Sequence, residues 1–378
     1  MIDNPYCEKF IEINNNSFDN SQHLFLVICT EKPKHIKKND YKNVKIIFLP
    51  RGVKRYISRE FIYILRKIIK SKKVFIHYLN DIFCNMVLVS SLIKKNIYNW
   101  ILWGGDLYEY IDVELYDKET KDIMLNRNIH LKSKKKSIVK TFVRKMAIYK
   151  ISNILTYIKG DYENVKKHFK TKAEMKPFFY IPPTDYKLIG KIDNLNKLPE
   201  SYNFKKQYDY VVQIGNSGDP SNNHIGILKK LSQIESTNFC VMVVLSYGNK
   251  EYIEEVDKIG KELLGEKYKP IKEFLAPEIY ASLLNQVDIA IMNHNRQQGV
   301  GNILSLLYMG KKVFLRNEVS TYQALREKGL NIYSIENYLN NFEELFVYKE
   351  EDKFTNKRLI DQCFNEKEAI SNYEDLYN

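Results

Sequence analysis

The sequence predicts an α/β protein built from two doubly wound domains. Apolar runs typical of buried strands alternate with amphipathic helical stretches, as in parallel sheets covered by helices on both faces. A polar stretch over residues 183–207 interrupts this alternation, which then begins again. At 378 residues the chain is also long for a single compact core. Ligands of such domains bind at the carboxyl ends of strands, so we expect the functional site in a cleft between the domains.

The expected elements follow the chain in a regular order. In the first half we expect strands at 24–29, 44–49, 74–76, 98–102 and 151–157, with helices at 59–70, 82–93 and 131–149. In the second half we expect strands at 208–214, 239–245, 287–292 and 312–315, with helices at 222–234, 250–264, 277–284, 303–308 and 322–328. The expected organisation is a first domain over 1–184, a linker over 185–207, a second domain over 208–334 and a polar helical tail over 335–378.

Composition narrows the class of protein. The formal net charge is +13 and is uneven: residues 1–190 carry 36 basic and 19 acidic side chains, whereas residues 191–378 carry 23 and 27. No apolar run reaches the ~18 residues that span a bilayer, and the N-terminus lacks a signal-peptide pattern. The five cysteines match no disulfide or zinc framework. These features argue against membrane-spanning and disulfide-rich secreted proteins and predict a cytosolic protein.

A glycine-rich loop follows the strand expected at 208–214. It comprises Gly215, Asn216, Ser217, Gly218 and Asp219, and Asn222 and His224 lie just beyond it. The two glycines let the backbone approach a phosphate closely, and the amides of the following helix favour an anion. Ser217, Asp219 and Ser221 are candidate helix caps, so the alternative is an ordinary capped turn between a strand and a helix.

A second polar loop, over 293–302, follows the strand expected at 287–292 and opens another helix. Arg296 can contact phosphate oxygens in bidentate fashion. Gln297 and Gln298 both donate and accept hydrogen bonds, which suits sugar hydroxyls, and Gly299 and Gly301 come next. The alternative is a polar helix start capped by Asn295. Two such loops at strand ends favour a nucleotide site over two unrelated turns.

A third loop supplies candidates for catalysis in the first half. Trp103, Gly104, Gly105, Asp106 and Tyr108 follow the strand expected at 98–102. Asp106 can act as general base toward an acceptor hydroxyl, or can simply cap the next helix. His77 ends the strand before it and is either a second candidate base or a structural histidine.

The sequence also lacks the motifs of other nucleotide enzymes. It has no Asp-x-Asp pair for a metal–diphosphate complex. It has neither a Gly-x-Gly-x-x-Gly fingerprint nor a Walker lysine motif. We therefore expect no metal and no cofactor, and a bound diphosphate would be neutralised by helix N-termini and Arg296.

A basic segment in the first half is a candidate membrane contact. Its cations are Lys132, Lys134, Lys135, Lys136, Lys140 and Arg144. Each cation near an anionic lipid surface contributes ~1 kcal/mol. The alternative is a solvated helix face. Nucleic acid is not an expected partner, because no recognition motif interleaves aromatic and basic residues.

Four motifs resemble the bacterial 4-alpha-L-fucosyltransferases of glycosyltransferase family 56. They are Trp103-Gly104-Gly105-Asp106-Leu107-Tyr108-Glu109, Gly215-Asn216-Ser217-Gly218-Asp219 with Ser221-Asn222 and His224-Ile225, Tyr252-Ile253-Glu254-Glu255-Val256, and Arg296-Gln297-Gln298-Gly299-Val300-Gly301. The likeness spans roughly residues 75–330. The family usually has alanine at the position of Gly105, and the stretch around His77 also departs from its pattern.

The resemblance implies a GT-B fold, with two Rossmann-like domains facing across a cleft, and a glycosyltransferase activity. The donor would be a TDP-linked deoxyaminosugar, such as TDP-Fuc4NAc, held in the second domain by the two loops and Tyr247. The acceptor would be a polyprenyl-pyrophosphate-linked saccharide bound by the first domain, in the biosynthesis of a surface polysaccharide or glycolipid. The implied location is peripheral, on the cytoplasmic face of the bacterial inner membrane.

Two other functions share this architecture. A nucleotide-sugar 2-epimerase uses the same pair of domains but needs no lipid surface. A sugar-nucleotide-binding module would hold the ligand without turning it over. Whether the sugar is transferred, epimerised or left unchanged discriminates among the three.

Overall fold

The computed structural model describes residues 1–36, 41–129, 137–182, 198–235, 237–338 and 342–378. Two compact units make up the chain. Unit 1 comprises Met1–Ile111, Lys135–Pro183 and Phe364–Asn378, and unit 2 comprises Asp112–Lys134 and Thr184–Cys363. These units are not the contiguous ranges expected from the sequence. A segment of the first half belongs to unit 2, and the end of the chain returns to unit 1.

The strands of unit 1 form two parallel sheets among its described residues. The smaller sheet pairs β1 (Phe25–Cys29) with β2 (Val44–Phe48). The larger has the order β3 (Lys73–His77), β4 (Ile97–Ile101), β5 (Asn153–Leu155) and β6 (Glu174–Lys176). The strand β6 was not expected, because three residues with two charges at a sheet edge give no hydrophobic pattern.

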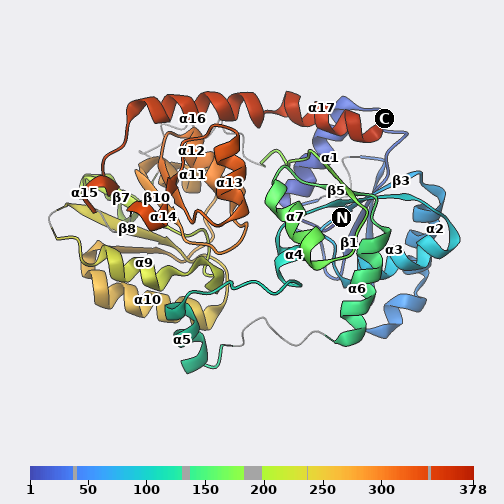
Figure 1. Ribbon diagram of the computed structural model, residues 1–378, viewed down its shortest axis with the longest axis horizontal. Coiled ribbons are helices and arrows are strands. Elements are labelled where there is room, and N and C mark those ends of the chain that lie inside the picture. Colours follow the sequence, from blue (N-terminus) through green and yellow to red (C-terminus); the bar gives the residue numbers. More distant parts are fainter. Residues whose placement is uncertain (37–40, 130–136, 183–197, 236, 339–341) are drawn as a thin grey trace. The chain divides into compact units, whose positions relative to one another are not determined.

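Helices pack around these strands (Figure 1). They are α1 (Pro5–Ser17), α2 (Arg59–Lys70), α3 (Asp81–Ile93), α4 (Gly105–Tyr108), α6 (Ile138–Lys150), α7 (Lys159–His168) and α17 (Glu366–Tyr377), with the 3-10 helix η1 (Val53–Ile57). The helix α17 packs against α1, and buried Tyr373 donates a hydrogen bond to the Phe179 carbonyl at 2.9 Å. This contact explains why the last helix belongs to unit 1 rather than to a separate tail.

Unit 2 contains a six-stranded parallel sheet. The strand order is β12 (Tyr333–Ser334), β11 (Lys312–Leu315), β10 (Ile289–Met292), β7 (Tyr210–Ile214), β8 (Phe239–Val244) and β9 (Tyr268–Ile271). The chain moves outward from β7 through β8 to β9, and then restarts on the other side of β7 with β10. In sheets of this kind the ligand crevice lies beyond the carboxyl ends of the strands at that reversal.

The sheet of unit 2 is covered on both faces. Figure 1 shows α9 (His224–Leu231) and α10 (Lys250–Leu264) over one face, and α11 (Pro277–Gln286), α12 (Val300–Tyr308) and α13 (Ser320–Glu327) over the other. All six residues of β8 are buried, which explains its continuous apolar sequence. The sequence pattern did not predict the edge strand β9, because this strand contains Pro270, a residue that only an edge strand tolerates.

Unit 2 also contains elements besides this sheet and the five helices over its faces. They are α5 (Lys118–Asn126), α14 (Ile335–Tyr338), α15 (Phe342–Leu345), α16 (Glu350–Cys363) and the 3-10 helices η3 (Glu200–Tyr202), η4 (Phe204–Lys206), η5 (Pro220–Asn222) and η6 (Gly265–Lys267). The helix α16 packs on α12.

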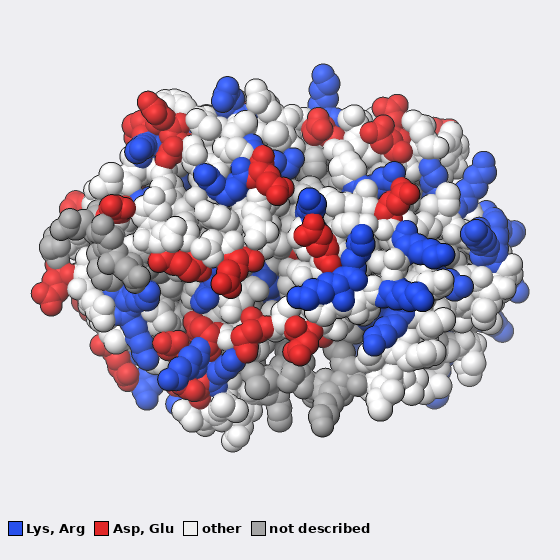
Figure 2. Space-filling model, viewed as in Figure 1, with Lys and Arg blue, Asp and Glu red and all other residues white. Residues whose placement is uncertain are grey.

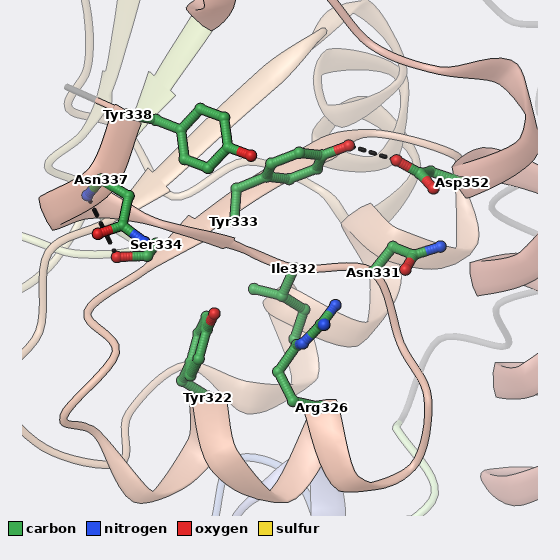
Figure 3. Close-up of a pocket in the computed structure, with 9 residues that line it drawn as sticks. All are labelled: Tyr322, Arg326, Asn331, Ile332, Tyr333, Ser334, Asn337, Tyr338 and Asp352. Atoms are coloured by element: carbon green, nitrogen blue, oxygen red, sulfur yellow. Dashed lines mark hydrogen bonds between the residues drawn. The ribbon is translucent and has the colours of Figure 1, made fainter. Parts of the chain in front are cut away.

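A cavity of about 220 Å³ lies beside β12 (Figure 3). Tyr322 and Arg326 extend into it from α13, and Tyr333 and Tyr338 line the other side. The Tyr333 hydroxyl donates to Asp352, which fastens α16 to the sheet edge. None of the site residues expected from the sequence lines this cavity.

Candidate active site

The two glycine-containing loops of unit 2 meet at the reversal of strand order. One follows β7 and the other follows β10, and these strands are neighbours. The Ser221 hydroxyl donates to Gln298 Oε1 at 2.6 Å, and Gln298 Nε2 donates to Asn216 Oδ1 at 3.4 Å. Residues separated by about eighty positions in the sequence therefore form one polar surface, of which Ser221 and Asn216 are the buried part and Gln298 is a partly exposed part.

A third loop, which follows β8, completes this surface. The Gly218 amide donates to the Tyr247 carbonyl at 2.7 Å, and the Asn249 amide donates back to the Gly218 carbonyl at 3.1 Å. A Cβ on Gly248, whose φ is +140°, would lie 2.2 Å from the Gly218 carbonyl carbon. Half-exposed Tyr247 places its hydroxyl 3.4 Å from Asn216 Nδ2. The structure thus brings Tyr247 to the other expected donor-binding residues.

Two expected ligand contacts, Asn222 and His224, are fully buried beneath the loop. Asn222 Oδ1 accepts hydrogen bonds from the Asn216 amide at 2.9 Å and from His294 Nε2 at 2.8 Å. Burial lowers the pKa of both His224 and His294 to about 3, so both imidazoles are neutral near pH 7. We therefore correct the roles of Asn222 and His224: they shape the glycine loop from below and do not face a ligand.

The accessible part of the surface is rich in hydrogen-bond donors. Arg296 is half-buried and makes no hydrogen bond or salt bridge with the residues that the structure describes. Gly299, with φ at +64°, starts α12 without a side-chain cap, so the first amides of this helix are unpaired. Gln297 and Gly301 are also partly exposed. A cation beside a helix N-terminus is an arrangement that can hold a diphosphate.

The loop 103–108 of unit 1 places a different set of side chains. Trp103 is partly exposed and donates from Nε1 to the Tyr180 hydroxyl at 3.1 Å. Gly104 is buried with φ at +83°, and a Cβ on Gly105 would meet the Tyr78 hydroxyl at 3.3 Å. The glycines therefore permit tight packing rather than leaving room for an acceptor.

The positions of two further residues of unit 1 differ from what the sequence predicted. Tyr108, expected on the acceptor side, is buried and donates to Asp161 Oδ1 at 2.7 Å. Tyr180 was missed, although the run Phe178-Phe179-Tyr180 before two prolines was a signal for an aromatic wall. Its ring centroid lies 4.9 Å from that of Trp103.

Asp106 is a structural carboxylate, which corrects its expected role as general base. Its side chain is completely buried. One carboxylate oxygen accepts from the Trp103 amide at 2.9 Å, and the other accepts from the Leu79 amide at 2.8 Å and Trp100 Nε1 at 2.7 Å. Burial raises the pKa of Asp106, and the Trp100 hydrogen bond opposes that rise. The carboxylate is fully buried and is held by these three hydrogen bonds, which keeps it away from an acceptor hydroxyl.

His77, the other candidate base, is also enclosed. It is 2% exposed, and its Nδ1 is hydrogen-bonded to the Tyr180 hydroxyl at 2.5 Å. Burial holds the pKa of His77 well below its ordinary value, so the ring is neutral near pH 7. The structural alternative is therefore the better account of His77, which supports Tyr180 from beneath.

The candidate membrane cations lie in different environments. Lys132, Lys134, Lys135 and Lys136 lie outside the described residues. Lys140 is exposed and pairs with Asp81 at 3.0 Å. Arg144 is 1% exposed, donates to the carbonyls of Leu79 and Asp106, and lies under the Tyr110 ring. Arg144 is thus an internal support for the 103–108 loop, and its expected contact with lipid is wrong because its guanidinium is buried.

Several solved structures share this fold, including one glycosyltransferase. Similar structures include HepE from Anabaena in complex with UDP (TM-score 0.65, 12% identity, 99% of this chain and 97% of that chain). A glycosyltransferase from Rickettsia africae matches equally well (TM-score 0.65, 12% identity, 99% and 93%). A putative UDP-N-acetylglucosamine 2-epimerase from Listeria monocytogenes is more distant (TM-score 0.51, 10% identity, 100% and 93%). The expected GT-B fold is confirmed.

The family model of the 4-alpha-L-fucosyltransferases, glycosyl transferase group 56, matches residues 131–355, which is more than half of the chain. The chain belongs to this family, as its motifs predicted. It is therefore a transferase that catalyses glycosyl transfer.

The corrected role of Asp106 gives a prediction. Asp106→Asn should lower the free energy of unfolding by about 1–3 kcal/mol, because an amide nitrogen would face donors that now reach a carboxylate oxygen. Denaturant unfolding measures this change, and Glu109→Gln, an exposed acid on the same loop, is the control. Turnover per folded molecule should stay within a few-fold of wild type. A fully stable variant that had lost turnover by two or more orders of magnitude would restore Asp106 as the base.

A second prediction concerns the turn at Gly215, whose φ is +62°. A Cβ there would lie 2.7 Å from Asn222 Oδ1 and 2.9 Å from His224 Nε2. Gly265 has a φ of +51° with no atom within 4 Å of its Cβ position, so Gly265→Ala isolates the backbone strain of ~1–2 kcal/mol. Gly215→Ala should cost about 1–3 kcal/mol more, because it displaces buried polar groups. Equal unfolding midpoints would refute the close packing of this turn.

Proposed function

We propose that the protein transfers a deoxyaminosugar from a TDP-sugar to a polyprenyl-pyrophosphate-linked saccharide during the biosynthesis of a surface polysaccharide or glycolipid. The observation that carries the donor half of this proposal is the meeting of the Gly215–Asp219 loop with the Arg296 loop at the reversal of strand order. HepE of Anabaena, which shares the fold, was solved with UDP, which supports a nucleotide ligand here. The TDP base and the sugar rest on the likeness to family 56.

The charge of the donor diphosphate is balanced by the protein itself in this proposal. Arg296 has no competing protein partner among the described residues, and the uncapped start of α12 adds unpaired amides. Gln297 and Gln298 can each exchange further hydrogen bonds with sugar hydroxyls, Gln298 in addition to those that it makes with Ser221 and Asn216. We therefore propose that transfer requires neither a divalent metal nor a cofactor.

The acceptor half of the proposal rests on unit 1. Trp103 and Tyr180 form an aromatic wall near the carboxyl ends of β3 and β4, where acceptors of this architecture bind. Aromatic rings stack on the apolar faces of sugars while their polar ends donate hydrogen bonds. Both Asp106 and His77 are enclosed, so the proton acceptor of an inverting transfer would be a different group.

We also propose peripheral association with an anionic membrane on the cytoplasmic side. Most of the exposed large apolar side chains in the described chain belong to unit 1. On α6 they form one stripe, which comprises Ile138, Val139, Phe142, Met146 and Tyr149. In Figure 2 basic side chains gather on the part of the face that unit 1 forms. Apolar residues beside cations are typical of interfacial helices.

The 3-10 helix η1 extends this apolar stripe. Val53 is 81% exposed and Ile57 is 79% exposed, and Arg51, Lys54, Arg55 and Arg59 flank them. Contacts through α3 connect η1 to α6: Asn85 donates to the Tyr56 hydroxyl at 3.3 Å and to the Asp81 carbonyl at 2.7 Å, and Asp81 pairs with Lys140. The described chain contains no helix with the length and apolarity of a membrane span.

A transfer assay tests the proposed function. Purified protein is incubated with TDP-Fuc4NAc and a polyprenyl-pyrophosphate-linked saccharide, with and without EDTA, and the products are separated by mass. The proposal expects a glycolipid extended by one sugar and free TDP in both conditions. A sugar epimerised without acceptor would favour the epimerase, and an unchanged donor that still binds would favour a binding module. Loss of transfer in EDTA, restored by added metal, would overturn the metal-free part of the proposal.

Arg296→Ala should weaken TDP binding by about 1.5–3 kcal/mol, which is the range for a charge-assisted hydrogen bond and corresponds to roughly ten- to hundredfold in Kd. Isothermal calorimetry measures this change. Arg326→Ala is the matched control, because it removes an exposed guanidinium elsewhere in unit 2. Unchanged TDP affinity in Arg296→Ala would remove Arg296 from the donor site.

The membrane surface gives a further prediction. Replacing Val53, Ile57, Ile138 and Phe142 together by serine should weaken binding to phosphatidylglycerol vesicles by more than tenfold, because each buried apolar side chain contributes ~1.5–3 kcal/mol. Vesicle sedimentation at two salt concentrations measures the affinity. Phe274→Ser, which removes an 84% exposed apolar side chain from unit 2, is the control. If the quadruple variant sediments like wild type, the stripe is only a solvated face.

A further inference from the structure

A segment from the first half of the chain is built into the donor-side unit. Residues 112–129, here called the strap, follow the 103–108 loop after three residues but belong to unit 2. The helix α5 within the strap packs against α9 and α10 (Figure 1). Tyr116, Met124 and Ile129 are buried in the same apolar core as the strands β7 and β8. The strap is therefore an integral part of the unit that carries the donor loops.

The strap contacts the donor loops through one fully buried residue, Asn223. The Asp117 amide donates to Asn223 Oδ1 at 2.9 Å, and Asn223 Nδ2 donates to the Leu115 carbonyl at 3.1 Å. The same Nδ2 donates to the Asn293 carbonyl at 3.1 Å, and Asn293 Nδ2 donates back to the Asn223 carbonyl at 2.9 Å. Asn223 has φ +49° and ψ +50°, a conformation that is rare for a residue with a side chain.

Arg316 closes these contacts into a ring. It lies on the loop after β11 and donates from Nε to Asn293 Oδ1 at 2.8 Å. Its Nη2 lies 4.0 Å from Asp117 Oδ2, and both side chains are mostly buried. The four members of the ring, Asp117, Asn223, Asn293 and Arg316, come from the strap and from the loops after β7, β10 and β11. The ring thus joins the strap to the two loops at the reversal of strand order and to the loop after β11.

We propose that this ring positions the two donor loops, and that Asp117 of the strap is a positioning residue for the nucleotide-sugar donor. Gly215–Asp219 ends four residues before Asn223, and Arg296 follows Asn293 by three, so the ring sets the spacing between the loops. Asp117 acts through Arg316 and Asn223 and touches no ligand itself. This inference rests on the proposed function, because it assumes that a nucleotide binds between these loops.

The strap also connects the ring, through the continuous chain, to the 103–108 loop of unit 1. Chain continuity joins its first residue, Asp112, to the loop that carries Trp103 within ten positions. The hydrogen bonds of Leu115 and Asp117 to Asn223 are the strap's contacts with the donor loops themselves. Donor binding should therefore order the strap. A ligand that holds the two donor loops together also restrains Asn223, the residue through which these loops contact the strap.

The Asp117→Asn variant tests the proposal. Asn is as good a helix cap as Asp, so the hydrogen bond that the Thr120 amide donates to Oδ1 of residue 117 at 2.9 Å is retained while the charge opposite Arg316 is lost. Asp122→Asn, an exposed acid on the same helix, is the matched control. TDP affinity is measured by calorimetry, and donor KM and kcat are measured separately at saturating acceptor. Arg316→Gln and the double variant complete a double-mutant cycle.

The proposal expects Asp117→Asn to raise the Kd for TDP and the donor KM by about tenfold, because the mostly buried charge opposite Arg316 is lost. It expects kcat at saturating donor to stay within about twofold, and the double variant to be no weaker than Arg316→Gln alone. Equal TDP affinity in Asp117→Asn and Asp122→Asn overturns the inference. Failure of wild type to bind TDP at all overturns the proposed function instead.

A measurement on the unaltered protein keeps the test decisive if Asp117→Asn does not fold. Hydrogen–deuterium exchange of wild type is followed with and without TDP. The amides of Asp117, Thr120 and Lys121 should exchange several-fold more slowly with TDP bound, whereas those of Lys258 and Glu262, exposed residues later in α10, should not change. Protection confined to the glycine loops, with none in the strap, overturns the inference.

Discussion

The reversal of strand order between β7 and β10 is the constraint on which the donor-side site depends. Because β8 and β10 flank β7 on opposite sides, the loops after β7 and β10 lead to helices on opposite faces of the sheet, and such sheets bind their ligands beyond this point. The strands themselves are buried on both faces, so they have little freedom to shift. The polar surface formed by Asn216, Ser221 and Gln298 follows from this arrangement of the sheet.

Both units support their loops with buried polar groups rather than with apolar packing alone. In unit 2, Asn222 and two neutral histidines lie beneath the glycine loop. In unit 1, Asp106 and Arg144 hold the 103–108 loop through backbone amides and carbonyls. A buried polar group without its partner is costly, so each network permits a single loop conformation. The residues with titratable or charged side chains beneath these loops therefore hold the loops in place. The groups that can contact a ligand are less buried.

The polar networks also explain why the chain is not divided simply into two halves. The strap of residues 112–129 supplies hydrogen bonds and apolar side chains that unit 2 needs, although it precedes much of unit 1 in sequence. The helix α17 does the reverse, because Tyr373 completes an aromatic cluster with Phe10 and Phe178 in unit 1. The strap and α17 each cover apolar residues that would otherwise be exposed to solvent.

The sequence by itself determined the fold class, most of the buried strands and the motifs of the donor loops, because these depend on local patterns: apolar runs, glycine turns and residues at strand ends. The motifs also determined the family. Only the tertiary structure decided which polar residues face outward. Asp106, His77, Asn222, His224 and Arg144 carry reactive or charged groups in sequence, and burial turned each into a support. Asn223 and Arg316 gained their places through contacts with distant segments, which no local pattern records.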